Sequence, residues 1–455
     1  MIHYGLNEYS GAHSSHRRTW FASRSGCARK GVATASVAGM CRQILGRFLL
    51  TISLVGLMAT VSAWGQTVRF ATYNVSLYAT RPGEVAERLA DGTDHQARCE
   101  AEIIQRIRPD VLLLNEVDYD AEGKLVEIFR KKYLSVGQNV SQSPEAAEPI
   151  EYPFRYFATV NTGEHSGFDL DRNGRLTTEP GSIDYGGDSW GFGQYAGQYA
   201  PVLLSRFPIQ TDKVRSFQKF LWKDMPGALL PDDPDTAASA DWYSKETLEK
   251  FRLSSKSHWD VPIDVQGHTL HVLVSHPTPP SFDGAEDRNG RRNHDEIRLW
   301  VDYISLDNEK YLYDDAGQKG GLAAGSSFVI MGDLNGDPHD GQGSAGIAQL
   351  LESPTILQYP APESAGGEEQ ANLQGEVNAT HVGNPRQDTL DAADKNGPGN
   401  LRLDYVLPSN NQKVVASGVF WPENRDALFK LVGEFPFPSS DHHLVWVDVD
   451  LSGEP

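Results

Sequence analysis

Cysteine is scarce in this chain. Only three cysteines occur among 455 residues, at Cys27, Cys41 and Cys99. The first two lie in an N-terminal part that we expect to be removed, so Cys99 remains alone and an intramolecular disulfide is excluded. A protein without disulfides must take its stability from a large apolar core, to which bound metal ions can add.

The sequence contains no apolar run long enough to predict a membrane anchor. The apolar run at residues 48–63 is shorter than the roughly 20 residues that span a bilayer. It follows Arg42 and Arg47 and ends in small residues, as a secretory signal peptide does. We therefore expect residues 1–63 to be an N-terminal extension and signal peptide, with Met40 as a candidate true start. The protein is expected to be secreted or periplasmic, without a transmembrane anchor.

Basic residues are few beyond this segment. Residues 1–63 hold seven of the 41 lysines and arginines and one of the 61 aspartates and glutamates, which leaves 34 against 60 and a net charge of −26. Such a field repels polyanions at long range. A nucleic-acid site would therefore need local basic residues or bound cations.

Internal repeats are absent, and strand-like and helix-like stretches alternate from residue 67 onwards. This mixed order predicts an α/β (α+β) fold with layers over one core, in a single domain at 67–455. Long loops rich in Gly, Asp and Pro are expected at about 137–200 and 353–400. Helices are predicted at 95–110, 121–132 and 294–306. Strands are predicted at 67–75, 111–118, 201–205, 259–265, 268–276, 402–408, 417–421 and 443–451, with another ending near Asp333.

Polar side chains recur where the predicted strands begin or end. Asp333 and Asn335 follow a buried strand, and they share one face because the side-chain period of a strand is two. A strand followed by an Asx turn explains this pair equally well. Each of the others, taken alone, has an ordinary explanation as a solvated or turn residue, but their joint occurrence indicates a site. They are Asn74, Glu116, His276, Asp404, Asp441 and His442.

Several short motifs in order resemble the endonuclease/exonuclease/phosphatase superfamily of metal-dependent phosphoesterases, which includes deoxyribonucleases, apurinic endonucleases and neutral sphingomyelinases. The motifs are "YN" at 73–74, "PDVLLLNEV" at 109–117, "VLLSRFPI" at 202–209, "SHPTPP" at 275–280, "GDLN" at 332–335, "RLDYVL" at 402–407 and "SDHH" at 440–443. One departure is Ala200-Pro201, where the family often has "GVA". The resemblance implies a four-layer α-β-β-α sandwich with two facing mixed β-sheets.

The resemblance also implies roles for these residues. A phosphodiester is anionic, so its hydrolysis needs a hard cation, an oriented water and donors to the phosphoryl oxygens. Mg²⁺ or Mn²⁺ is the expected metal, because both prefer oxygen ligands. Glu116, Asn74 and Asp441 are the expected metal ligands. The expected catalytic residues are Asp333, which activates the water, Asn335, His442 oriented by Asp404, and His276 on the leaving-group side.

Two further clusters have open interpretations. Arg288, Arg291 and Arg292 follow His276 and form either a phosphate clamp or a solvated loop paired with neighbouring acids. Asp169, Asp171 and Asn173 precede Gly174 as in the start of a calcium loop, although the final glutamate of such a loop is missing. A structural Ca²⁺ and a polar turn both fit that segment.

The sequence thus predicts a secreted, divalent-metal-dependent phosphodiesterase, with an extracellular nuclease as one form of it. A phosphomonoesterase or a phospholipid headgroup hydrolase of the same superfamily is the alternative, because the shared residues handle the phosphoryl group and not what is attached to it. A non-catalytic binding module is disfavoured, since every expected catalytic position is filled. The expected partner is a phosphodiester substrate, either nucleic acid or a phospholipid or small phosphate ester, and the expected state is a monomer.

Overall fold

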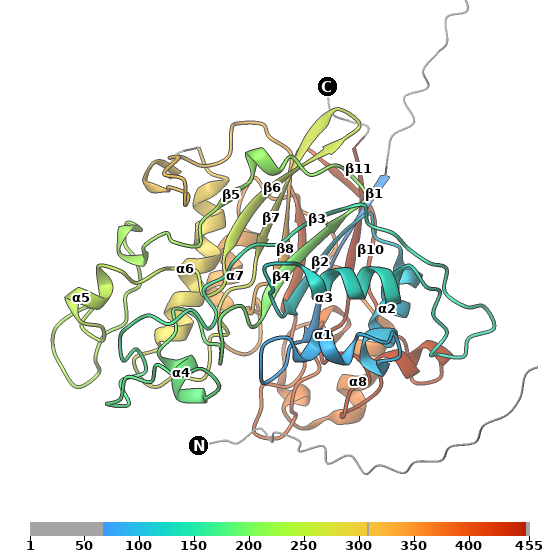
Figure 1. Ribbon diagram of the computed structural model, residues 1–455, viewed down its shortest axis with the longest axis horizontal. Coiled ribbons are helices and arrows are strands. Elements are labelled where there is room, and N and C mark those ends of the chain that lie inside the picture. The colour runs from blue at the N-terminus through green and yellow to red at the C-terminus, as the bar shows by residue number, and fades with distance from the viewer. Residues whose placement is uncertain (1–66, 307–308, 452–455) are drawn as a thin grey trace, which may run out of the picture. The chain divides into compact units, whose positions relative to one another are not determined.

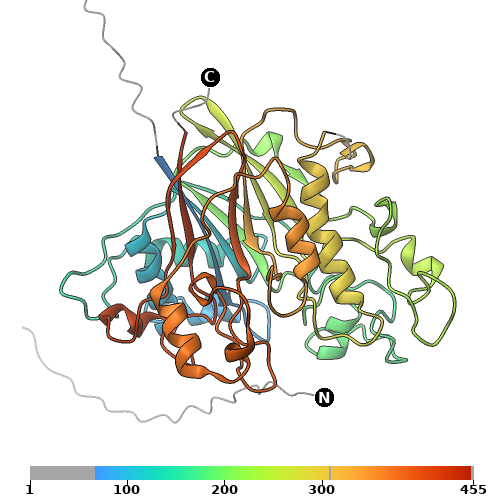
Figure 2. The ribbon, with the colours of Figure 1, turned by 180° about the vertical axis from the view of Figure 1, so that it is seen from behind.

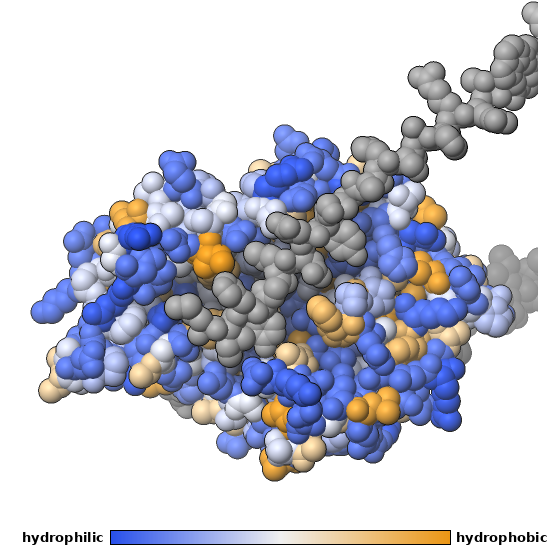
Figure 3. All heavy atoms as spheres, turned by 90° about the horizontal axis from the view of Figure 1, so that it is seen from below, coloured by the Kyte–Doolittle hydropathy of each residue, from blue (hydrophilic) through white to orange (hydrophobic). Residues whose placement is uncertain are grey.

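The computed structural model describes residues 67–306 and 309–451. The expected extension and signal peptide at 1–63 lie outside the described residues. Within the described ranges, no helix is long and apolar enough to cross a membrane. On the face shown in Figure 3, hydrophilic side chains predominate and apolar ones are scattered, which is ordinary for a protein surface.

Eleven strands among the described residues form two mixed sheets. The larger sheet has the order β10 (Lys413–Val419), β11 (Val445–Asp450), β1 (Thr67–Leu77), β2 (Val111–Val117), β4 (Ala200–Ser205) and β3 (Phe154–Tyr156). The smaller sheet has the order β5 (Arg215–Ser216), β6 (His258–Val265), β7 (His268–Ser275), β8 (Phe328–Asp333) and β9 (Asp404–Pro408). The pairs β1–β2 and β7–β8 are parallel, and all other neighbours are antiparallel.

The central strands of the two sheets carry apolar side chains on both of their faces. One face of each sheet can therefore pack against the other sheet, and the opposite face can pack against helices. In β8, Val329 and Met331 lie in the core between the sheets, together with residues of β1 and β2. Phe328 and Ile330 of the same strand point the other way and pack with Trp300 in a second core under the helices. A strand buried on both faces reads as a continuous apolar run, which is why the sequence pattern located β2 and β8 well.

Helices cover the outer face of each sheet (Figures 1 and 2). The larger sheet is covered by α2 (His95–Ile107), which starts where the Asp94 side chain accepts from the amide of Ala97 and ends at Arg108 in the left-handed region. The smaller sheet is covered by α6 (Arg288–Tyr303) and α7 (Ser344–Leu351). The remaining helices are α1 (Glu84–Arg88), α3 (Lys124–Phe129), α4 (Ile183–Gly187), α5 (Lys245–Leu248) and α8 (Ala365–Gln374). The predicted four-layer sandwich is confirmed.

Some element bounds differ from the prediction. Helix α6 begins at Arg288, six residues before the apolar periodicity becomes visible at His294. The predicted helix at 121–132 is divided into α3 and a π-helical turn at Arg130–Leu134. Strands β3 and β5 were not predicted, because two or three residues are too few to show a period. The long loop segments contain β3 and α4 in one case and α8 in the other.

Candidate active site

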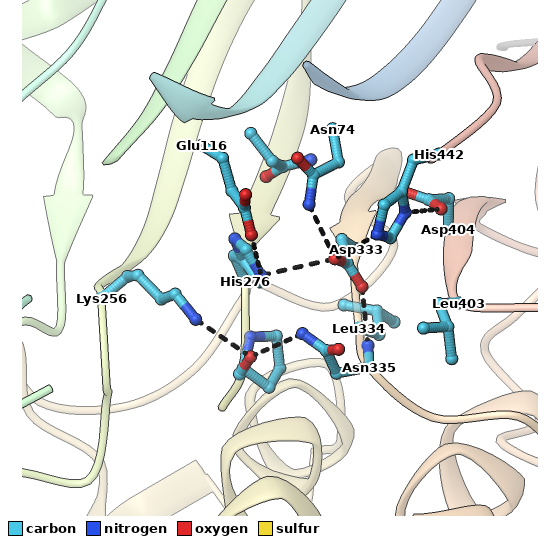
Figure 4. A network of polar contacts seen from close by, with 12 residues as sticks. Asn74, Glu116, Lys256, His276, Asp333, Leu334, Asn335, Leu403, Asp404 and His442 are labelled. Atoms are coloured by element: carbon cyan, nitrogen blue, oxygen red, sulfur yellow. Dashed lines mark hydrogen bonds and ion pairs between the residues drawn. The ribbon is translucent and has the colours of Figure 1, made fainter. Parts of the chain in front are cut away.

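One rim of the sandwich collects the polar residues that the sequence singled out (Figure 4). The carboxyl ends of β1 and β2 meet there because these strands are parallel, and so do those of β7 and β8. Strand β9 runs antiparallel to β8, so its first residue, Asp404, pairs directly with the last residue of β8, Asp333. Strand β11 is antiparallel to β1, so Asp441 and His442 before it reach the same rim. Strand direction therefore brings the ends of six strands to one place.

Asp333 is the centre of this cluster. Its Oδ2 accepts a hydrogen bond from Asn74 Nδ2 at 3.1 Å and lies 3.4 Å from His276 Nε2 and 3.7 Å from His442 Nε2. Its Oδ1 accepts from the backbone amide of Asn335 at 3.0 Å. Burial raises the pKa of Asp333; nearby Asp404 and Glu116 add to the rise, whereas His442 opposes it. A single carboxylate oxygen thus faces one amide and two imidazoles.

The residue before Asp333 must be small for this arrangement to form. A Cβ at Gly332 would lie 1.9 Å from the backbone oxygen of Ser275. Because β7 and β8 approach so closely at their ends, the carboxylate that follows Gly332 comes within reach of His276, the residue after Ser275. The glycine of "GDLN" therefore has a packing reason.

Glu116 projects from a β-bulge. The pairing of β2 shifts register both against β1, between Asn74 and Leu77, and against β4, between Leu114 and Val117. Glu116 itself has φ of 60°, an unusual value for a residue that is not glycine. Bulges redirect side chains next to active sites, and this one turns the carboxylate of Glu116 toward His276, with 4.0 Å between Oε1 and Nε2.

Asp404 and His442 form a second hydrogen-bonded unit. His442 Nδ1 lies 2.7 Å from Asp404 Oδ2, which also accepts from Thr389 Oγ1 at 2.8 Å. Burial would lower the pKa of His442, but the charges of Asp404 and Asp333 outweigh it and raise the pKa well above the ordinary value. The ring is therefore held as an imidazolium with Nε2 directed at the cluster.

His276 has the opposite character. Burial lowers its pKa well below the ordinary value, and the charges of Lys256 and His442 lower it further, so the ring is neutral. Its Nδ1 has no hydrogen-bond partner among the described residues. The next residue, Pro277, offers its carbonyl to Asn335 Nδ2 at 3.1 Å, which ties the two loops that carry the site together.

The donor set suits a hard divalent cation. Glu116, Asn74 and Asp441 provide carboxylate and amide oxygens, the ligands that Mg²⁺ and Mn²⁺ prefer. Burial raises the pKa of Glu116, and the charge of Asp441 adds to the rise, whereas His442, Lys256 and Asn74 oppose it. Glu116 and Asp441 are partly exposed, and a cation would relieve the repulsion between their charges, so the residues present fit one. Asp333, Asp404 and His442 also offer donor atoms within 4.8 Å of one another, but Asp404 and His442 are already hydrogen-bonded to each other.

Sequence reasoning missed one side chain in this cluster. Lys256 precedes β6, is 7% exposed, and extends its ammonium group toward the loop after His276 (Figure 4). Burial lowers the pKa of Lys256, while the charges of Glu296, Glu116 and Asp333 oppose that change. A lone lysine between serines, in "SSKSHW", carries no pattern that could have revealed it.

The polar residues of the two open clusters already have protein partners. Arg288 pairs with Glu286, Arg291 with Asp232, and Arg292 is buried and donates to three backbone carbonyls. The phosphate clamp stays a prediction without support from these contacts. The three carbonyls that accept from Arg292 belong to Leu253, Trp190 and Arg252.

The calcium-loop segment folds into a turn with converging acids. Asp169 and Asp171 both accept from the amide of Asn173, and Asp188 joins them with oxygen atoms within 4.8 Å. Asp188 accepts from the amides of Leu170 and Thr177, so its oxygens already have partners. Calcium binding there stays a prediction.

One protein family and several solved structures are similar to this chain. A model of the Endonuclease/Exonuclease/phosphatase family matches residues 71–442, which is most of the chain. Among curated proteins none matches. Similar solved structures include an endonuclease/exonuclease/phosphatase from Beutenbergia cavernae DSM 12333, with 17% identity and a TM-score of 0.44, covering 85% of this chain and 72% of that one.

Two other solved structures are similar at a comparable level. An endonuclease/exonuclease/phosphatase family protein from Leptotrichia buccalis C-1013-b has 14% identity and a TM-score of 0.41, covering 84% of this chain and 100% of that one. Sphingomyelinase C from Streptomyces griseocarneus has 16% identity and a TM-score of 0.38, covering 84% and 99%. Identities this low transfer no substrate to this chain.

Proposed function

The chain belongs to the endonuclease/exonuclease/phosphatase family of metal-dependent phosphoric ester hydrolases, and from that premise we propose that it is an exported, divalent-metal-dependent phosphodiesterase. The convergence of Asn74, His276 and His442 on Asp333 Oδ2 is the observation that supports this function. Hydrolysis of a P–O bond requires a proton acceptor, donors to the phosphoryl oxygens and hard oxygen ligands around one small volume. This cluster offers candidates for each.

Asp333 is the acceptor for the proton of the attacking water. Its carboxylate is fixed by Asn74 Nδ2 and by the amide of Asn335, so it does not need to reorganise during the reaction. The raised pKa of Asp333 brings it closer to the working pH, where a general base is most effective. The water oxygen attacks phosphorus as Asp333 takes its proton.

The two histidines have different tasks because their charges differ. The imidazolium of His442, oriented by Asp404, donates to a phosphoryl oxygen and returns a proton to the leaving alkoxide as the P–O bond breaks. The neutral ring of His276 lies on the leaving-group side and donates a hydrogen bond there. Asn335 holds the water or a phosphoryl oxygen. A divalent cation held by Glu116, Asn74 and Asp441 supplies positive charge to the phosphoryl group when bound.

The favoured substrate is a phosphodiester cleaved with little base specificity. The acidic chain disfavours long polyanions, and the sequence has no clustered aromatic-basic pattern of the kind that reads bases. Cleavage of DNA or RNA would then depend on phosphate contacts and on divalent ions. A nuclease is the first form of this proposal.

Activity profiling tests the choice among substrates. The purified protein is assayed with DNA, RNA, phospholipid vesicles, a small phosphodiester and a small phosphomonoester, each with Mg²⁺ or with chelator. We expect metal-dependent hydrolysis of diesters and strong inhibition of nucleic-acid cleavage by salt. Efficient hydrolysis of a phospholipid or a monoester, with DNA and RNA untouched, would reject the nuclease form. Undiminished turnover under chelator would reject the metal requirement.

Export is the remaining part of the proposal. It rests on the apolar run at 48–63 and the small residues that end it. We expect the exported form to begin near Trp64 and translation from Met40 to suffice for export. N-terminal sequencing of the protein outside the cytoplasm checks this. A product that retains residues 1–39 would contradict it.

A further inference from the structure

A buried ammonium group lies next to the active-site loop that follows His276. Lys256 is 7% exposed, and its Nζ donates to the carbonyl of Pro277 at 3.4 Å, which is long for a hydrogen bond. This is its only hydrogen bond within the described residues, although an ammonium group has three N–H donors. A buried charge with unused donors is costly unless something else accepts from it.

The direction of the Lys256 side chain is defined by a shared acceptor. Asn335 Nδ2 donates to the same Pro277 oxygen at 3.1 Å, so the ammonium and the amide of Asn335 meet at one atom (Figure 4). Glu116 and Asp333 are close enough for their charges to favour the ammonium. The unused donors of Lys256 therefore lie beside the groups assigned to the metal and to the water.

Glu296 of α6 holds the backbone on both sides of this contact. Its Oε1 accepts from the amide of Ser255 at 2.6 Å and from Ser255 Oγ at 3.0 Å, and its Oε2 accepts from the amide of Thr278 at 2.7 Å. Glu296 is fully buried, and one carboxylate thus fixes both the residue before Lys256 and the second residue after His276. Such support positions Lys256 before substrate arrives.

We propose that Lys256 is a further catalytic residue, whose ammonium group donates to a non-bridging oxygen of the substrate phosphoryl group and stabilises the charge that develops there. This inference rests on the phosphoesterase function proposed above. Lysine binds phosphate as a point charge, and such a charge acts most strongly in a buried site. The three arginines of the α6 start have protein partners, whereas Lys256 has donors to spare.

The test compares charge-removing and charge-retaining variants of the full chain. Lys256→Met removes the charge at similar length, Lys256→Arg retains it, and Lys223→Met removes a partly exposed lysine that pairs with Glu249. Lys256→Gln replaces the Met variant if that variant does not fold. Two readouts are taken at constant Mg²⁺: kcat and KM on a small phosphodiester, and the affinity for inorganic phosphate measured by calorimetry. The unfolding midpoint of each variant is recorded as a folding control.

We expect Lys256→Met to lower kcat by about 10²-fold, the usual loss for one donor to a developing oxyanion. The affinity for inorganic phosphate should fall at least ~10-fold, Lys256→Arg should restore most of both losses, and Lys223→Met should change neither. A purely structural role would lower kcat and the unfolding midpoint together while leaving phosphate affinity unchanged. That result, or wild-type values of kcat and phosphate affinity in Lys256→Met, would overturn the proposal.

The phosphate measurement separates this inference from the proposed function. If the wild type hydrolyses no phosphodiester but binds phosphate through Lys256, the assigned reaction fails and the contact stands. If the wild type is an active phosphodiesterase and Lys256→Met equals it in both readouts, the contact fails and the reaction stands.

Discussion

Replacing Asp404 with Asn should slow turnover by about 10²-fold while leaving the fold and KM nearly unchanged. Asn retains an oxygen of the same shape next to His442 Nδ1 and Thr389 Oγ1, 2.7 and 2.8 Å away in the wild type. Only the negative charge is lost. Two unit charges about 4 Å apart interact by roughly 4 kcal/mol at an effective dielectric constant of about 20. We take this energy as the upper limit for the effect of removing the charge. A charge-assisted hydrogen bond contributes about 1.5–3 kcal/mol.

These limits translate into a loss of roughly 10- to 10³-fold, since about 1.4 kcal/mol corresponds to a factor of ten. The assay is steady-state hydrolysis of a small phosphodiester at saturating Mg²⁺. Thr389→Val is the matched control, because it removes the hydroxyl donor to the same carboxylate oxygen and keeps the charge. It should lower kcat less than 10-fold. If kcat of Asp404→Asn stays within twofold of the wild type while the unfolding midpoint is unchanged, His442 does not depend on Asp404 and the reasoning is refuted.

Three other predictions follow from the same structure. Glu116→Ala should weaken Mg²⁺ binding in calorimetry, whereas Asp333→Asn should keep that affinity and lose kcat; the reverse pattern would exchange their roles. Gly332→Ala should lower the free energy of unfolding by about 2 kcal/mol or more, because its Cβ would lie 1.9 Å from the Ser275 oxygen, and unchanged denaturant melting would contradict this close approach. His258 is buried and its pKa is lowered by burial to about 4 from 6.5, so the unfolded chain binds its proton first as the pH falls through this window. The wild type should therefore lose roughly 3 kcal/mol more unfolding free energy than His258→Gln between pH 7 and pH 4, at about 1.36 kcal/mol per pH unit; equal slopes for the two proteins would show that His258 is accessible to protons when folded.

The sequence predicted the positions of most strands because these strands carry strong local signals, whereas the four-layer arrangement was implied by the family resemblance. Strands β2 and β8 are continuous apolar runs, and α2 has a clear helical period with a capping aspartate at Asp94. The two strands that were not predicted, β3 and β5, pair with neighbours over two or three residues only. These strands form because they pair with an adjacent strand and not because of their own side chains, so no periodicity could predict them.

For the site, the sequence by itself determined which residue types stand at the ends of which strands. Carboxylates, amides and histidines that follow buried strands are visible in a linear pattern, since burial alternates with a fixed period and stops where the strand stops. Only the tertiary structure decided that Asn74, His276 and His442 meet at one oxygen of Asp333 and that Lys256 contacts the carbonyl of Pro277 beside them. Those contacts join residues between 21 and 259 positions apart in the chain, and they depend on strand direction, a bulge at Glu116 and the close approach at Gly332. Local periodicity does not encode the distance between residues on two different sheets. For this reason the sequence around Lys256, a single lysine among serines, did not predict its position in the site.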